Sequence, residues 1–206
     1  MQVTGLIKTI IFDIGNVLVD FRWRQVYESF GLKEEDIEKL ADATVRHQAW
    51  LDLDKGIITT EEAEAEYIKA APEYREYIER IYPDMTPMLV QFSYAVPWIK
   101  SLKERGYKIY ILSNWSHPAY ETCKDNALNF LPMADGVVFS YQEFAVKPDR
   151  KIYDIICNRY DINPEEAVFL DDSEPNINAA RAYGLHGIHF KSYEQARTEL
   201  EKLLAE

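Results

Sequence analysis

Cysteine is rare in this sequence, and long apolar segments are missing. The 206 residues include two cysteines, Cys123 and Cys157, which lie far apart and form no zinc-binding pattern. No apolar run approaches the ~20 residues that a membrane-spanning helix needs. The first residues also lack the basic segment and apolar stretch of a secretion signal. We therefore expect two free thiols without a chemical task, no membrane association and a reducing, cytoplasmic location.

Positive charge is also in short supply. Lysine and arginine number 23 against 35 aspartates and glutamates, which gives a formal net charge of -12. This balance argues against a general attraction to nucleic acid or to an anionic membrane. If the ligand carries a phosphate, a few local cations, backbone amides and a metal ion must hold it. We expect a small-molecule partner, and the sequence does not indicate an oligomeric state.

The length of the chain favours one core domain that carries an insertion, because 206 residues are many for one compact unit and few for two full domains. Hydrophobic residues make up 47% of the chain and charged residues 28%, which is typical of a soluble globular protein rather than a disordered or fibrous one. The chain is therefore able to bury a sizeable core.

Apolar runs alternate along the chain with segments of helical periodicity. Such runs, with little internal alternation, are typical of parallel strands that are covered on both faces. The predicted strands are Leu6 to Phe12, Lys108 to Leu112, Gly136 to Phe139, Ala167 to Leu170 and Gly187 to Phe190. The predicted helices run from about Pro97 to a stop at Gly106, and over Arg150 to Tyr160, Asn176 to Tyr183 and Tyr193 to Leu204. This alternation predicts an α/β fold with a doubly wound, mainly parallel, Rossmann-like sheet.

Residues 19–93 differ in character from the rest of the chain. Glu, Ala, Tyr and Ile recur there at helical spacing, and no run resembles a strand. Thr59 and Glu62 fit a capping box, which predicts the start of a helix. We expect an all-helical cap over 19–93 and an α/β core made of 1–18 and 94–206. Because the cap would leave the core just after the first strand, at the edge where open α/β sheets bind ligands, we expect it to act as a lid.

Polar side chains follow three of the predicted strands. They are Asp13, Ser113 and the neighbouring pair Asp171 and Asp172. Because parallel strands joined by right-handed crossovers place their carboxyl ends at one edge, we expect these side chains to converge. Clustered carboxylates with open positions for water and phosphate suit Mg²⁺. We expect Asp13 and Asp172 to be metal ligands, with the backbone carbonyl of Gly15 as a third oxygen.

The same residue types suit phosphoryl transfer. An aspartate can attack phosphorus and form an aspartyl-phosphate, which divides one difficult displacement into two easier ones. At its ordinary pKa of about 3.9 such a group is ionised at neutral pH. Mg²⁺, Lys147, the hydroxyl of Ser113 and backbone amides would stabilise the transferring phosphoryl group. Pro148 favours an extended loop, from which Lys147 can reach inward.

Four segments of the chain also occur, in this order, in a known family. They are Ile10 to Val17, Ile109 to Asn114, Val146 to Pro148 and Val168 to Ser173. Each is a weak signal by itself, because an Asp or Ser after a strand is more often a turn or helix-cap residue. Together they span essentially the whole chain, which resembles the haloacid dehalogenase (HAD) superfamily of hydrolases with a helical cap inserted after the first strand.

The resemblance implies a role for each matching residue. It makes Asp13 the nucleophile and a metal ligand, and it places the family's backbone metal ligand at Gly15. Ser113 would bind phosphate through its hydroxyl group. Lys147 would be the cation that links the nucleophile to the phosphate, so both Ser113 and Lys147 are candidate catalytic and substrate-binding residues.

The fourth segment would supply the remaining acidic groups. Asp172 matches the main acidic metal ligand of the family. Asp171 would hold the metal through water or orient Asp172. Asn176 occupies the place where many relatives have a further acidic residue.

Gly15 is the position at which this sequence departs from many relatives. Many phosphatases and mutases of the superfamily have a second aspartate there, which protonates the leaving alkoxide and then activates water, and glycine can do neither. The sequence Asp-Ile-Gly-Asn-Val is similar to a bacterial subgroup that includes glucose-1-phosphate phosphatases. We therefore expect a preference for leaving groups of low pKa, such as that of a sugar 1-phosphate. Asp20 and His117 are candidates for a substitute acid, although a structural or surface role is the simpler interpretation.

Specificity is expected to come from the cap and from the end of the second strand. His47, Trp50 and Asp54 lie in a stretch that resembles a turn between cap helices, and aromatic plus polar side chains suit a sugar ring. The simpler interpretation is that Trp50 packs in the cap core and that His47 is a solvated helix residue. Asn114 follows the second strand directly and could contact the phosphate or the sugar.

The sequence therefore predicts a Mg²⁺-dependent phosphatase that hydrolyses a small phosphate monoester, with a sugar phosphate favoured, through an aspartyl-phosphate on Asp13. One alternative is a 2-haloacid dehalogenase, in which Asp13 attacks carbon and no metal is required. Asp171, Asp172 and Lys147 favour phosphorus chemistry over that alternative. A second alternative is a catalytically weak phosphate-binding protein, which the missing acid at Gly15 suggests.

Overall fold

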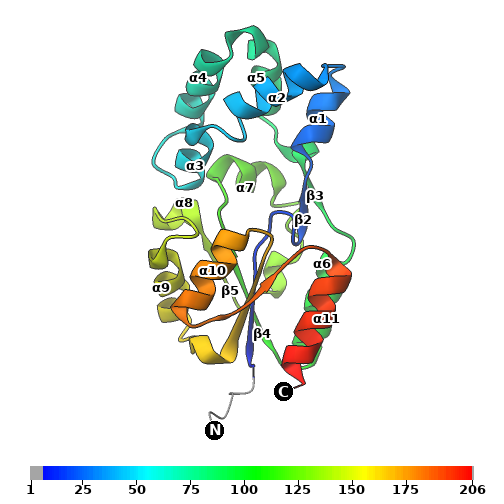
Figure 1. Cartoon of the computed structure of the whole chain (residues 1–206), viewed down its shortest axis with the longest axis vertical. Coiled ribbons are helices and arrows are strands. Elements are labelled where there is room, and N and C mark those ends of the chain that lie inside the picture. The colour runs from blue at the N-terminus through cyan, green and yellow to red at the C-terminus, as the bar shows by residue number, and fades with distance from the viewer. Residues whose placement is uncertain (1–6, 206) are drawn as a thin grey trace.

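A five-stranded sheet forms the centre of one half of the molecule in the computed structural model, which describes residues 7–205 (Figure 1). The strand order is β5-β4-β1-β6-β7, and every pair of neighbours is parallel. The strands are β1 (Thr9–Phe12), β4 (Lys108–Ser113), β5 (Gly136–Phe139), β6 (Ala167–Asp171) and β7 (His186–His189). β1 is therefore the central strand, and β4 and β6 are its neighbours.

The predicted strands are confirmed, with small shifts at their ends. β4 and β6 each extend one residue beyond the predicted end, and β7 begins one residue before Gly187. The first strand begins at Thr9, and Leu6 lies outside the described residues. Shifts of this size are expected, because helix and strand ends are the least defined parts of an element. The doubly wound, parallel sheet predicted from the sequence is present.

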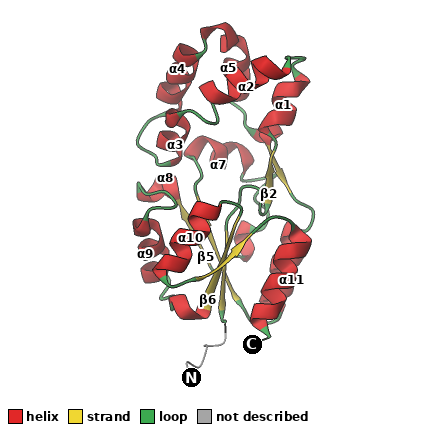
Figure 2. Ribbon diagram, viewed as in Figure 1, coloured by secondary structure: helices red, strands yellow, loops and turns green. Residues whose placement is uncertain are grey.

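Helices cover both faces of the sheet (Figure 2). They are α6 (Ala95–Glu104) and α11 (Tyr193–Leu204) on one face, and α9 (Arg150–Arg159) and α10 (Glu174–Tyr183) on the other. Alternate residues of β1 serve the two faces: Ile10 and Phe12 belong to the same buried cluster as Leu200 of α11, whereas Ile11 belongs to the cluster that contains Ile156 of α9. Because both faces are buried, the strands need apolar residues at every position, which explains their unbroken apolar runs.

The segment between β1 and α6 forms a group of helices at the other end of the molecule (Figure 1). They are α1 (Trp23–Ser29), α2 (Glu34–Ala43), α3 (Gln48–Asp54), α4 (Thr60–Ala70) and α5 (Arg75–Ile81). Their interior is aromatic. The hydroxyl of Tyr27 hydrogen-bonds to those of Thr44, at 2.7 Å, and Tyr82, at 3.2 Å, and the ring of Tyr67 lies 4.9 Å from that of Tyr82. The prediction that this segment is mainly helical is confirmed.

Two short strands close the base of the helical segment, so the expectation that it contains no strand is wrong. β2 (Val19–Phe21) pairs antiparallel with β3 (Leu89–Gln91). Three residues are too few to show the alternation by which strands are recognised. The pairing brings the two connections to the sheet together. The division into a core of 1–18 and 94–206 and a cap of 19–93 stays a prediction.

The predicted capping box is present at the start of α4. The hydroxyl of Thr59 accepts a hydrogen bond from the backbone N–H of Glu62 at 3.2 Å, and the carboxylate of Glu62 accepts one from the backbone N–H of Thr59 at 2.8 Å. The two bonds satisfy N–H groups that the first turn of a helix leaves unpaired. Local sequence therefore fixes the start of this helix.

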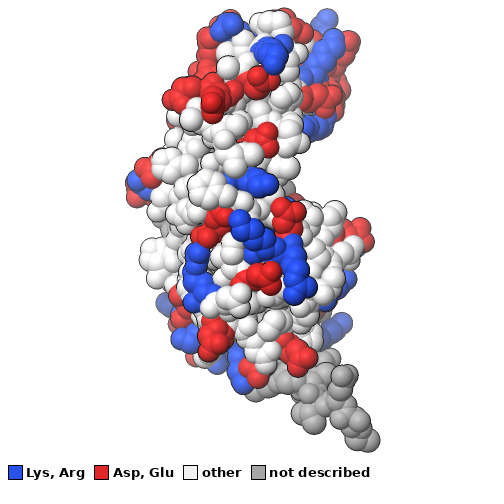
Figure 3. Space-filling view, turned by 90° about the vertical axis from the view of Figure 1, so that its left-hand side faces the viewer, with Lys and Arg blue, Asp and Glu red and all other residues white. Residues whose placement is uncertain are grey.

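The core also contains the short helices α7 (His117–Cys123) after β4 and α8 (Ser140–Glu143) after β5, and the 3-10 turns Leu131–Met133 before β5 and Pro164–Glu166 before β6. On the face shown in Figure 3, acidic and basic side chains are intermixed at both ends of the molecule, and a largely uncharged band lies between them. That face therefore carries no extended patch of one sign. Within residues 7–205, no helix combines the length and the apolar character that a membrane span requires.

The turn after α3 anchors the helical segment to the core. The hydroxyl of Ser140 in α8 donates to the carbonyl of Asp54 and accepts from the backbone N–H of Trp115 at 2.9 Å. Gly56 has a φ of +74°, and a Cβ atom there would lie 2.4 Å from the carbonyl oxygen of Tyr141. A side chain at Gly56 would therefore conflict with both the backbone conformation and the neighbouring helix.

We expect Gly56→Ala to destabilise the protein by more than the ~1–2 kcal/mol that a left-handed conformation costs an alanine, because the contact with Tyr141 adds to that cost. Gly31→Ala is the matched control: Gly31 has a φ of +73°, but a Cβ atom there would meet no atom within 4 Å. Urea unfolding of both variants measures the two losses. Equal losses would show that the close packing against α8 contributes nothing.

Candidate active site

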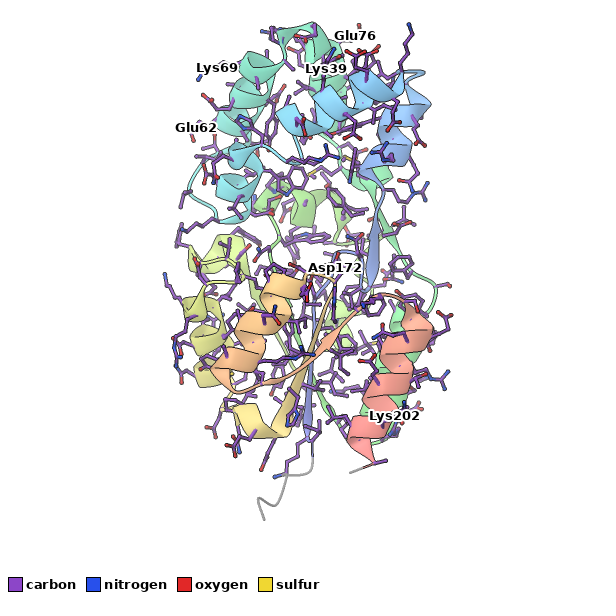
Figure 4. The ribbon with its side chains drawn as sticks, viewed as in Figure 1. Lys39, Glu62, Lys69, Glu76, Asp172 and Lys202 are labelled. Carbon is purple, nitrogen blue, oxygen red and sulfur yellow. The ribbon has the colours of Figure 1, made fainter. Side chains whose placement is uncertain are left out.

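Three polar residues meet at the carboxyl ends of the central strands. Asp13 follows β1 directly, and it lies between Ser113, the last residue of β4, and Asp171, the last residue of β6. The register of the sheet pairs the end of β1 with both neighbours at one level, which brings these side chains together. Asp172 lies near the amino end of α10, between the sheet and the helical segment (Figure 4). The convergence expected from the sequence is present.

The Asp13 carboxylate is held by two donors on one of its oxygens. The hydroxyl of Ser113 donates to Oδ1 at 2.7 Å, and the Nζ atom of Lys147 lies 2.8 Å from the same oxygen. Among residues 7–205, no hydrogen bond reaches the second oxygen, Oδ2. One oxygen therefore fixes the orientation of the group, and the other is available to a ligand.

Lys147 is buried between two carboxylates. Its Nζ atom lies 2.8 Å from Oδ1 of Asp13 and 2.6 Å from Oδ2 of Asp171, and its side chain is 1% exposed. Burial alone would lower the pKa of Lys147, but the charges of Asp13 and Asp171 outweigh burial and raise that pKa above its ordinary value. Lys147 is therefore a fixed cation beside Asp13 at neutral pH.

Asn114 fixes the loop that carries Lys147. Its amide nitrogen donates to the carbonyl of Lys147 at 3.1 Å, and its amide oxygen accepts from the backbone N–H of Lys147 at 2.8 Å. This pair of bonds is a positioning role that the sequence did not suggest. Asn114 also lines the cavity described below. Its contact with the substrate therefore stays a prediction.

Asp171 is the second carboxylate that contacts Lys147. It is fully buried, and its carboxylate accepts hydrogen bonds from the backbone N–H of Ser173 at 2.8 Å and from the amide of Asn176 at 3.0 and 3.1 Å. These donors fix the orientation of the Asp171 carboxylate beside Lys147. Asn176, at a place where the family resemblance suggested a further acid in many relatives, is here a donor that holds Asp171. A water-mediated bond from Asp171 to a metal stays a prediction.

Asn16 is a residue of the site that the sequence analysis did not assign. Its amide donates to Oδ2 of Asp172 at 2.8 Å. Asn16 has a φ of 54°, in the left-handed region that asparagine tolerates better than most residues. The one signal in the sequence that could have indicated a role for Asn16 was its polar side chain among the apolar residues from Ile14 to Val19. The backbone carbonyl of Asp172 is in turn paired with the ring of His189 at 2.9 Å.

The three carboxylates form a group that suits a hard metal ion. One oxygen from each of Asp13, Asp171 and Asp172 lies within 4.8 Å of the others. Burial raises the pKa of Asp13 to about 7; Lys147 opposes this rise, and the two other carboxylates add to it. The ordinary pKa expected from the sequence did not take this burial into account. A divalent cation would favour the ionised form, and Gly15, whose carbonyl is the expected third ligand, lines the adjacent cavity.

A cavity of about 130 Å³ opens beside Asp13. Apolar and polar side chains share its lining: Phe21, Trp50, Met85, Leu89, Trp115 and Ala119, with Asp13, Gly15, Asn16, Asp54, Ser113, Asn114, Ser116 and Asp172. The helical segment and the core therefore both contribute to one cavity. The ring of Trp50 also packs against that of Phe21, with 5.4 Å between the centroids, so its packing role and its cavity position coexist.

His47 does not line the cavity. Its Nδ1 atom accepts a hydrogen bond from the backbone N–H of Ala49 at 3.2 Å and so caps the start of α3. A cap of this kind satisfies one of the unpaired N–H groups of the first helical turn. The structural interpretation of His47 fits this position better than a role in binding the substrate.

Asp54 brings a carboxylate of the helical segment into the cavity. It is the last residue of α3 and is 8% exposed. Burial is the main cause that raises the pKa of Asp54 to about 7; a hydrogen bond from Trp50 lowers it, and the charge of Asp13 raises it. Asp54 was expected among the specificity residues, and its position in the cavity is consistent with that expectation. Its raised pKa was not foreseen.

Comparison with known proteins gives one family match and several relatives. The profile of the haloacid dehalogenase-like hydrolases matches residues 7–184. D-ribitol-5-phosphate phosphatase of Bacteroides thetaiotaomicron is 27% identical over 223 residues, which cover 97% of this chain and 99% of that protein. Acyl-CoA dehydrogenase family member 10 of Mus musculus is 30% identical over 164 residues. These residues cover 75% of this chain but only 15% of that much longer protein.

A solved structure shares the fold. The magnesium complex of the HAD family enzyme bt-2542 of Bacteroides thetaiotaomicron superposes with a TM-score of 0.75, at 22% sequence identity. The superposition covers 95% of this chain and 99% of that one, so both the sheet and the helical segment have counterparts there.

Proposed function

Because the chain belongs to the haloacid dehalogenase-like hydrolases, we propose that it hydrolyses a small phosphate monoester through an aspartyl-phosphate on Asp13 and that it requires Mg²⁺. The observation that carries the proposal is the setting of the Asp13 carboxylate. It meets Lys147 and Ser113 on one oxygen and lies within 4.8 Å of two further carboxylates. A nucleophile, a cation for the phosphate and an acidic group for a metal are thus combined at one place.

In the proposed reaction, Asp13 attacks the phosphorus atom of a phosphate bound in the cavity. A bond forms from a carboxylate oxygen of Asp13 to phosphorus, and the bond from phosphorus to the leaving oxygen breaks. Lys147 and the hydroxyl of Ser113 stabilise the phosphoryl oxygens during this transfer. Water then attacks the aspartyl-phosphate, which releases inorganic phosphate and restores the Asp13 carboxylate.

Asp13, Asp172 and the backbone carbonyl of Gly15 would hold Mg²⁺, with Asp171 bound through water. The donors are all oxygen atoms, which suits Mg²⁺ better than softer metals. When bound, the ion offsets the repulsion between the carboxylates and the phosphate and polarises the phosphoryl oxygens. The magnesium complex of the structural relative named above supports the choice of the ion.

A sugar or polyol phosphate is the substrate class that we propose. The cavity is small and combines the rings of Trp50 and Trp115 with the polar Asn114, a mixture that suits a hydroxylated carbon chain. A relative along the whole chain is a D-ribitol-5-phosphate phosphatase. The similarity to glucose-1-phosphate phosphatases remains part of this proposal.

We also propose that residues 19–93 form a cap domain over a core made of 1–18 and 94–206. Trp50 and Asp54 of the helical segment line the cavity together with core residues, so the site is complete only when the two parts are together. The paired strands at the base of the segment hold its two connections side by side. A cap that opens and closes about this base would admit substrate and then exclude water.

Removal of divalent metal should abolish phosphatase activity. We expect EDTA to lower phosphate release from sugar phosphates by at least ~10²-fold, and excess Mg²⁺ to restore it, because the clustered carboxylates otherwise repel the phosphate. A colorimetric assay of inorganic phosphate measures the effect. The control is halide release from 2-haloacids in the same buffers. Dehalogenation that persists in EDTA would contradict our assignment and support the dehalogenase alternative.

A catalytically weak phosphate-binding protein is the other alternative, and the covalent intermediate distinguishes it. A phosphatase of the proposed mechanism forms an acyl phosphate on Asp13, which rapid acid quenching can trap. Stabilisation by Mg²⁺ with a phosphate mimic, without turnover on a broad panel of esters, would support the binding protein instead.

A further inference from the structure

The proposed reaction needs a group that protonates the leaving oxygen, and Gly15 offers none. Gly15 lines the cavity, and a Cβ atom there would meet no atom within 4 Å, so the place beside Asp13 is open. Neither Asp20 nor His117 lines the cavity, and the side chain of His117 is 65% exposed. Within the described part of the chain, Asp54 supplies the one carboxylate of the cavity lining that lies outside the metal-binding group.

Asp54 is held at the cavity by its backbone. Its carbonyl accepts a hydrogen bond from the hydroxyl of Ser140, and that hydroxyl also accepts from the backbone N–H of Trp115, a residue of the same cavity. The turn at Gly56 packs against the carbonyl of Tyr141. The end of α3 is therefore fixed relative to the strand ends. Asp54 thus lines the same cavity as Asp13 from a fixed backbone position.

The charges around Asp54 suit proton transfer. It faces Asp13 and Lys147 from the core, Tyr67 from α4 and Trp50 from its own helix. Burial raises its pKa to about 7, the Asp13 charge adds to the rise, and Lys147 and Trp50 oppose it. Near neutral pH, both protonation states of such a group are populated. A group of this kind can give a proton in one step and take one back in the next.

We propose that Asp54 is the general acid and general base of the reaction on Asp13, supplied by the helical segment in place of the side chain that Gly15 lacks. The inference rests on the proposed function and deepens it. In the first step, Asp13 forms its bond to phosphorus, the bond to the leaving oxygen breaks, and the Asp54 proton passes to that oxygen to give the alcohol. In the second, the Asp54 carboxylate takes a proton from water as that water attacks the aspartyl-phosphate. Phosphate, the Asp13 carboxylate and protonated Asp54 result.

The test compares Asp54→Asn with the wild type on two kinds of ester, an alkyl phosphate such as ribitol 5-phosphate and an aryl phosphate whose phenol has a low pKa. An alkoxide needs a proton to leave, whereas the phenolate leaves without one. We expect Asp54→Asn to lower kcat on the alkyl ester by ~10²–10⁴-fold. On the aryl ester we expect a burst of about one equivalent of phenol and then slow turnover, because only the attack of water is impaired.

Two further variants separate chemistry from structure. Asp52→Asn makes the same change on the same helix at a residue that does not line the cavity, and it should keep wild-type kinetics. Asp54→Glu keeps a carboxyl group and should retain part of the activity on alkyl esters. Equal losses of Asp54→Asn on both esters without a burst, or no loss at all, would overturn the assignment.

The melting temperature of Asp54→Asn distinguishes a catalytic role from a structural one, because the loss of a structural residue would lower it. The folded protein binds the Asp54 proton more tightly than the unfolded chain, so ionised Asp54 costs stability increasingly as the pH rises from 3.8 to about 7. The asparagine variant should therefore melt no lower than the wild type at pH 8. A lower melting temperature would mark Asp54 as structural and refute the proposal.

The kinetic results also separate the two proposals. If the wild type hydrolyses neither ester, the proposed function itself fails. If it hydrolyses both esters and Asp54→Asn behaves identically, only this inference fails.

Discussion

Asp13→Asn should abolish phosphate release and leave the fold intact. The amide is a poor nucleophile, so no aspartyl-phosphate forms, and we expect a loss of ~10⁵-fold or more. The amide oxygen can still accept hydrogen bonds from Ser113 and Lys147, which bind one oxygen of the native carboxylate. The change also removes a buried negative charge beside two others. Steady-state phosphate release, together with circular dichroism and a thermal melt, measures both parts of this prediction.

Asp20→Asn is the matched control for that experiment. Asp20 lies in β2, is partly exposed and does not line the cavity, so its loss should change the rate by no more than a few-fold. The same variant tests Asp20 as a substitute acid. Turnover of Asp13→Asn at a rate near that of the wild type would refute the covalent mechanism, whatever the fate of the other proposals.

Much of the core could be predicted because its signals are local. The strands carry apolar residues at nearly every position, and the residue at the end of each strand is visible in the sequence. Asp13, Ser113 and Asp171 therefore follow from the strand ends and from the rule that parallel strands share one carboxyl edge. The order β5-β4-β1-β6-β7 then explains why Asp13 receives contacts from both sides.

The supporting amides of the site could not be predicted, because their partners lie far along the chain. Asn114 binds the backbone of Lys147, 33 positions away, and Asn16 binds Asp172, 156 positions away. An asparagine after a strand predicts a turn as readily as a contact of this kind. The pattern gives the residue type, and only the folded chain gives the partner.

The raised pKa of Asp54 was hidden for a different reason. The sequence places Asp54 in a stretch that resembles a turn between helices, where aspartate is usually solvated. Its burial depends on the docking of α3 against Ser140 and on the close approach of Gly56 to Tyr141. These contacts join two parts of the chain that local patterns describe separately. Local patterns also missed β2 and β3, because these segments are recognised as strands by their pairing with each other and not by their sequences.

Lys147→Met should destabilise the protein by ~3–5 kcal/mol as well as abolish activity. The lysine neutralises two carboxylates in a buried position, with contacts of 2.8 Å to Asp13 and 2.6 Å to Asp171. Methionine fills a similar volume but leaves both carboxylates without a cation, and removing one partner of a buried ion pair carries a cost of this size. Urea unfolding in EDTA, which prevents a metal ion from replacing the lost charge, measures the effect.

A second substitution separates the electrostatic cost from simple packing loss. The double variant Lys147→Met, Asp171→Asn lacks one of the two buried carboxylates that the loss of Lys147 leaves without a cation. We therefore expect it to recover part of the lost stability but none of the activity. Lys103→Met is the matched control, because Lys103 pairs with Asp135 at 2.7 Å while its side chain is 33% exposed, and it should cost at most ~1 kcal/mol. If the double variant is less stable than Lys147→Met, the two residues do not act as a pair. In that case the cation beside Asp13 must be explained by its contact with the nucleophile alone.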